Sequence, residues 1–179
     1  MGIRNILLHL DNLDASGPRL KTAIHYARKH EAHLRGLYLT TYKYFEPRTS
    51  SERSDYEKAE EIFKWATATA GVSSEWIQLD RQSSGASLMT DIMTVQAYYT
   101  DLVIVGQPNF HPPSLSIPPE LPEHLIRTCG RPVLIVPYAG KFETAGDRIM
   151  IAWRAGRESV RSINDAMPCI EKAHHVSVV

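Results

Sequence analysis

Short apolar runs alternate with helical patterns along most of the chain. Each run is short and rich in β-branched or other apolar residues, which predicts a strand. The predicted strands are Asn5–Leu10, His33–Leu39, Ser74–Leu79, Asp101–Gly106 and Pro132–Tyr138. This alternation is typical of a parallel sheet covered by crossover helices, so we expect an α/β fold.

Helix signals lie between these runs. Ser16 is a candidate cap with Pro18 in the first turn of the first helix, and Ser54 with Glu57 forms a candidate capping box for the second. The last helix before residue 130 is expected over 119–129. The tryptophans fall on predicted apolar faces or strands, so we expect core positions for Trp65, Trp76 and Trp153.

The chain then restarts its own pattern. Residues 148–153, RIMIAW, match NILLHL; a helical pattern follows, and residues 174–179, HHVSVV, resemble the second predicted strand. We therefore predict a first domain over residues 1–138, a linker over 139–147 and an incomplete β-α-β repeat over 148–179.

Composition excludes several classes of protein. Lys plus Arg number 20 and Asp plus Glu number 20, so the general electrostatic attraction of a nucleic-acid or anionic-membrane binder is absent. No window reaches the length of a membrane span, and no signal peptide is recognisable at the N-terminus. Cys129 and Cys169 lie far apart and are expected to be free thiols in a reducing compartment. These features predict a cytoplasmic protein with no nucleic-acid or membrane partner.

The order of elements, together with LDNLDASGP after the first strand, TDLVIVGQ at the fourth and RPVLIVPY at the fifth, resembles the universal stress protein family. The resemblance is to the tandem subgroup, in which two such domains share one chain. It implies an open five-stranded parallel sheet in the order 3-2-1-4-5, with helices on both faces. It also implies a ligand crevice between strands one and four, where general rules for open α/β sheets place one.

The loop after the fourth strand departs from the family's nucleotide motif. The resemblance implies Gly, two residues, Gly, nine residues, then Gly and Ser or Thr; here Gly106 matches, but Asn109, Pro119 and Glu120 occupy the other three positions. Proline lacks an N–H group, and a glutamate places negative charge where phosphate would bind. We therefore expect no cofactor in the first domain, with ATP bound through an altered loop as the alternative. Asp11 matches the acidic position that contacts the nucleoside, although it also suits a turn or a helix N-terminus.

Other constellations are weaker. The spacing of His25, His30 and His33 does not suit a shared metal ion. Asp11, Asp14 and Asp80 resemble the acidic pocket of a response-regulator receiver, but the lysine expected after its fifth strand is absent. No nucleophile with a base can be assigned, so we expect no enzymatic activity.

Two features predict self-association. The run Val133–Val136 would form an apolar edge strand, and the half repeat carries more apolar surface than two strands and a helix can bury. We expect a homodimer through that strand or through the half repeats. The favoured function is a regulatory or interaction domain in the stress response, acting with an unknown protein partner; a nucleotide-binding universal stress protein is the alternative.

Overall fold

The computed structural model of the chain describes residues 2–11, 13–40, 50–80, 89–108, 118–140, 142 and 145–179. Five parallel strands form one sheet in the order β3-β2-β1-β4-β5, as predicted. These strands are β1 (Asn5–Leu10), β2 (His33–Thr40), β3 (Ser74–Asp80), β4 (Leu102–Gly106) and β5 (Val133–Val136). The central strand β1 pairs with β2 on one side and with β4 on the other.

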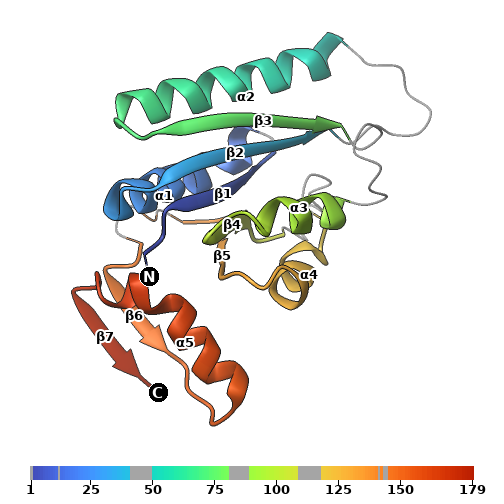
Figure 1. Cartoon of the computed structure of the whole chain (residues 1–179). Helices are drawn as coiled ribbons and strands as arrows, with labels where there is room; N and C mark the ends of the chain where they lie inside the picture. The colour runs from blue at the N-terminus through green and yellow to red at the C-terminus, as the bar shows by residue number, and fades with distance from the viewer. Residues whose placement is uncertain are drawn as a thin grey trace.

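Four helices cover the two faces of this sheet (Figure 1). They are α1 (Leu13–His30), α2 (Ser50–Thr69), α3 (Met89–Ala97) and α4 (Leu121–Thr128). Helices α1 and α2 pack on one face and α3 and α4 on the other, and each face has its own apolar cluster. The α/β fold class and the strand order are therefore confirmed.

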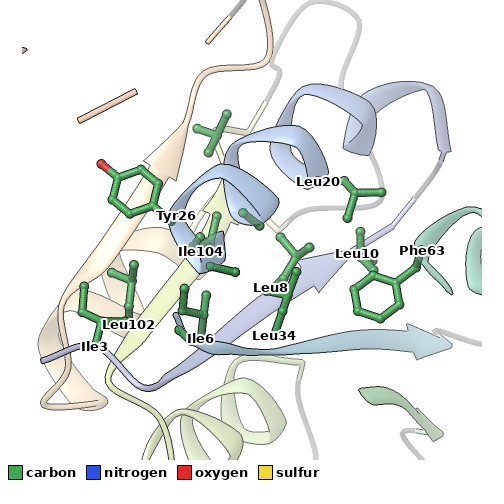
Figure 2. Packing of buried hydrophobic residues seen from close by; sticks show 14 residues of the cluster. Ile3, Ile6, Leu8, Leu10, Leu20, Tyr26, Leu34, Phe63, Leu102 and Ile104 are labelled. Atoms are coloured by element: carbon green, nitrogen blue, oxygen red, sulfur yellow. The ribbon is translucent and has the colours of Figure 1, made fainter. Parts of the chain in front are cut away.

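Alternation along β1 explains how one strand supplies both clusters. Ile6, Leu8 and Leu10 belong to the α1/α2 cluster, whereas Leu7 belongs to the α3/α4 cluster. Successive side chains of a strand point to opposite faces of the sheet. Because helices cover both faces of β1, its sequence is a mostly apolar run rather than an alternation of apolar and polar residues. Figure 2 shows Ile6, Leu8 and Leu10 with Phe63 of α2 in the first of these clusters.

The first two helices begin earlier than their sequence signals predicted. Helix α1 starts at Leu13, which places Pro18 inside the helix rather than in its first turn, and α2 starts at Ser50, which places Ser54 and Glu57 within the helix. Polar residues that can cap a helix can also continue one when the chain upstream adopts helical dihedrals, so these two predicted boundaries were wrong.

The last part of the chain forms a second, small sheet. Strand β6 (Arg148–Ile151), helix α5 (Arg157–Ile170) and strand β7 (His175–Val178) form a β-α-β unit, and β6 pairs with β7 in parallel. The order and pairing repeat those of β1, α1 and β2. Among the described residues, none from 145 onward is fully buried. The unit thus has the predicted pattern but no fully buried core of its own.

This unit contacts helix α1 of the first part. The Lys29 ammonium lies 2.8 Å from an Asp147 carboxylate oxygen and 3.3 Å from the Gly146 carbonyl oxygen. Lys172, just after α5, donates to the Lys29 carbonyl, and Cys169 packs against the α1/α2 cluster. We call these contacts the α1 seam. It consists of a few polar contacts and one thiol, so it positions the β6-α5-β7 unit without giving it a continuous apolar core.

Candidate functional site at the carboxyl end of β1

The topology places the candidate site at the carboxyl ends of β1 and β4. Strand order reverses between these two strands, because the chain moves from β1 to β2 and β3 on one side and returns to β4 and β5 on the other. Open α/β sheets bind ligands outside the carboxyl ends of their strands at such a switch point. In this chain, β1 ends at Leu10 and is followed by Asp11, and β4 ends at Gly106.

A buried ion pair occupies the end of β1. The Asp11 carboxylate lies 3.1 Å from Nη2 of Arg19, and Nη1 of Arg19 donates to the His9 carbonyl oxygen at 2.7 Å. Nη1 also lies 3.4 Å from Nδ1 of the His9 ring. The three residues are 7%, 2% and 0% exposed, respectively. The acidic residue that sequence singled out is therefore not a free carboxylate.

Burial governs the protonation of this cluster. The pKa of His9 is lowered to about 4, mainly by burial and in smaller part by the nearby Arg19 charge, while Asp11 opposes the shift. Burial also lowers the pKa of Arg19, whereas the coulombic attraction and hydrogen bond of Asp11 raise it. At neutral pH the cluster thus contains a neutral imidazole beside an Arg–Asp pair whose charges cancel.

Gly106 and Glu120, the other predicted site residues that the structure describes, make no hydrogen bond or ion pair with this cluster. Gly106 is buried at the end of β4, where it lies opposite Val136 of β5 in the parallel register. Glu120 is exposed immediately before α4, and its side chain makes no capping hydrogen bond. Asn109 lies outside the described residues. The predicted phosphate loop therefore presents an exposed carboxylate at the start of α4, as far as the described residues reach.

The alternative constellations gain no support from the described part of the chain. Within it, no group of three His, Cys, Asp or Glu side chains could hold a metal ion. His25 and His30 belong to α1, whereas His33 starts β2 and its Nδ1 lies 2.8 Å from the Ser73 hydroxyl. The side chains of Asp14 and Asp80 lie outside the described set, so the acidic pocket of a receiver is not tested.

An open groove of about 560 Å³ lies at the opposite end of the sheet. Its lining includes Arg4, Arg28, His33 and Ser73, which lie at or near the amino ends of the strands and at the end of α1. None of the predicted site residues lines it. The position rule for α/β sheets favours the carboxyl end, so we do not assign function to this groove.

Sequence reasoning missed Arg19 and His9. A signal existed for Arg19, because Arg19, Ala23, Tyr26 and His30 follow the spacing i, i+4, i+7 and i+11 of one helix stripe. All four are buried on α1. A charged residue on an apolar stripe indicates a buried partner, and the nearest carboxylate along the chain with the required placement is Asp11.

No protein-family model matches the chain, and no curated protein matches it. Solved structures do. A universal stress protein from Archaeoglobus fulgidus is 13% identical and superposes with a TM-score of 0.57, covering 76% of this chain and 95% of its own. The chain has the fold of the universal stress proteins.

Two further structures with this universal stress protein fold extend the comparison. One from Archaeoglobus fulgidus in complex with dAMP has 13% identity and a TM-score of 0.55, covering 76% of this chain and 99% of its own. Another, from Archaeoglobus fulgidus DSM 4304, has 15% identity and a TM-score of 0.67. The match covers 97% of this chain and 64% of the Archaeoglobus fulgidus DSM 4304 chain. That match must therefore extend into the β6-α5-β7 unit.

No helix within the described ranges combines the length and apolar character needed to cross a lipid bilayer.

Proposed function

We propose that this chain is a regulatory or interaction protein of the universal stress protein family, acting in the stress response without catalysis of its own. The fold supports the family, and the composition supports a cytoplasmic location. The order and parallel pairing of β6, α5 and β7 support the view that residues 148–179 open a second copy of the first domain.

We further propose that the first domain, residues 1–138, does not bind ATP. The observation that carries this proposal is Glu120, an exposed carboxylate at the residue before α4. A helix N-terminus binds phosphate through free N–H groups and its positive dipole end, and a carboxylate at this place competes with the anion and repels it. Pro119 beside it supplies no N–H group.

ATP at millimolar concentration should leave the melting temperature of the wild-type protein unchanged, because a ligand raises it only by binding the native state. The complementary variant combines Asn109→Gly, Pro119→Gly and Glu120→Ser, and it should gain an ATP-dependent rise. Differential scanning fluorimetry measures both. A rise of several degrees in the wild type would contradict the proposal. It would favour the alternative, a nucleotide-binding protein with an altered loop. The dAMP complex of a protein with the same fold supports that alternative.

We also propose a homodimer. Within the described sheet, β5 is an edge strand that pairs only with β4, and Ile135 on it is 37% exposed. An apolar edge strand offers unpaired backbone groups to a second strand, and two-fold symmetry makes such a contact self-complementary. The β6-α5-β7 unit contacts α1 of its own chain through the α1 seam, so β5 is now the favoured surface and mutual packing of the half repeats is the second choice.

Light scattering after size exclusion should report about twice the chain mass of 20.2 kDa. Ile135→Lys should shift the protein toward the monomer or cause precipitation, because it places a charge in the proposed strand contact. Ile126→Lys is the matched control, since Ile126 is 58% exposed on α4, and it should leave the mass unchanged. A monodisperse wild-type monomer at tens of micromolar would show that this surface does not associate.

A further inference from the structure

Arg19 reaches from one face of the sheet to the other around the end of β1. Its helix, α1, packs on the face that also contains Leu8 and Leu10. His9 alternates with these residues and therefore points to the opposite face. Arg19 nevertheless contacts both the carbonyl oxygen and the ring nitrogen of His9. The guanidinium thus lies across the carboxyl end of β1, on the β1 side of the switch point.

The contacts fix the tautomer of His9. An arginine side chain can only donate hydrogen bonds, so Nδ1 of His9, which lies 3.4 Å from Nη1 of Arg19, must be the accepting nitrogen. The ring proton of the neutral imidazole then lies on Nε2. This nitrogen is buried and has no partner among the described residues, and the same is true of Nε of Arg19 and Oδ2 of Asp11.

The cluster therefore keeps unused hydrogen-bonding capacity at the place where the fold binds ligands. Two buried donors, on His9 and Arg19, and one buried acceptor, on Asp11, have no partner within the described ranges. Buried polar atoms without partners are uncommon, and in a native protein each calls for an explanation. Here all three belong to side chains that contact one another.

We propose that the Arg19 side chain occupies the switch point in place of a ligand. Its guanidinium pairs with the Asp11 carboxylate and so closes the site to ligands that would need this carboxylate as a hydrogen-bond acceptor. The ligand class excluded in this way is neutral and rich in hydrogen-bond donors, with the hydroxyl and amino groups of a nucleoside as the model chemistry. This inference rests on the proposed function and adds a second, phosphate-independent barrier to nucleotide binding.

The physical reason is restricted access to the Asp11 carboxylate. Arg19 holds Oδ1, and Oδ2 is buried although it has no partner among the described residues. A ligand donor that reaches Asp11 by displacing Arg19 breaks a charge-assisted hydrogen bond and leaves the guanidinium buried without a carboxylate. A neutral hydroxyl or amino group cannot replace the lost charge attraction. Removal of the guanidinium frees Asp11 and also vacates the space that the arginine side chain fills.

The test compares adenosine binding by wild type and by Arg19→Ala, using isothermal titration calorimetry. Adenosine carries no phosphate, so the loop after β4 does not influence this comparison. The wild type should show no binding at millimolar adenosine, and Arg19→Ala should bind at least tenfold more tightly. Arg28→Ala is the matched control, since Arg28 is an exposed arginine on the same helix, and it should behave as the wild type. Equal binding by wild type and a folded Arg19→Ala variant, or binding by neither, would overturn the inference.

A measurement on the wild type decides the matter if Arg19→Ala does not fold. Nitrogen-15 NMR should show a slowly exchanging Nε–H of Arg19 and a single neutral His9 tautomer, protonated at Nε2, that persists down to pH 5. Rapid solvent exchange of the Arg19 Nε–H, or titration of His9 at its ordinary pKa, would overturn the inference. Titration of the wild type with ATP beside adenosine separates the two proposals, because binding that requires the phosphates contradicts the proposed function alone.

Discussion

Replacement of Asp11 by alanine should lower the free energy of unfolding by about 3 to 5 kcal/mol, the usual cost of removing one partner of a buried ion pair. The variant leaves the Arg19 guanidinium, 2% exposed, with no carboxylate beside it. The lost Coulomb attraction is not replaced by water, because the site is closed to solvent. Urea unfolding followed by circular dichroism measures the change.

Two further variants isolate the cause. Asp11→Ala combined with Arg19→Met removes both charges and should recover most of the lost stability, because no charge then remains buried. The pair formed by Arg127 and Glu123 on α4 is the surface control, with both side chains 74% exposed. Arg127→Ala should cost less than about 1 kcal/mol. If Asp11→Ala proved as mild as Arg127→Ala, the buried pair would not have the importance assigned to it.

Stability should fall steeply as the pH drops from 6.5 to 4. Burial lowers the pKa of His9 and of His30 to about 4 from an ordinary value of 6.5. Between these values the unfolded chain takes up protons that the folded protein does not, so acidification favours unfolding; above pH 6.5 neither state is protonated and the effect vanishes. One pKa unit corresponds to about 1.4 kcal/mol, so His9 alone accounts for roughly 3 kcal/mol.

Urea unfolding at a series of pH values tests this slope. His9→Gln removes the buried imidazole and should flatten the profile, while His175→Gln is the matched control, since His175 is exposed on β7 and should leave the slope unchanged. Lys172, Lys29 and His25 face His30 and add to its shift after burial. A His9→Gln profile as steep as that of the wild type would assign the acid sensitivity elsewhere.

The sheet could be predicted because its strands are buried on both faces. A strand of this kind is a short apolar run, and β1 and β4 are such runs. The strand order followed from resemblance of the whole pattern rather than from any single strand. Boundaries of α1 and α2 were less predictable, since capping residues such as Ser54 are also compatible with a helix interior.

Tryptophan positions show where pattern alone fails. Trp76 packs against the α1/α2 cluster as expected, but Trp65 is 71% exposed and Trp153 43% exposed, so those two predicted core positions were wrong. In α2 the contact face is narrow: Ala59 and Phe63 are buried while Ile62 is 45% exposed. A helix that covers a sheet edge buries only one stripe of side chains. The size or hydrophobicity of a residue does not reveal whether it lies within that stripe or outside it.

The candidate site was predicted only by position. Asp11 lies where the topology rule places a ligand, but its ion pair with Arg19 depends on a side chain that crosses the end of β1. Such a contact joins residues from opposite faces of the sheet. Periodicity assigns each residue to one face, so it gives no direct indication of a contact between them.

The fully buried residues lie in the first domain and not in the β6-α5-β7 unit, and this affects the order in which the chain can fold during synthesis. All fully buried residues that the structure describes lie between Ile3 and Val136. The central strand β1 needs β4 as a neighbour, and Ile6 pairs with Leu102 about a hundred positions later. A ribosome therefore has to deliver most of the first domain before β1 is enclosed. The β6-α5-β7 unit emerges after the first domain, so it can dock on the outer surface of α1 only once that surface has formed.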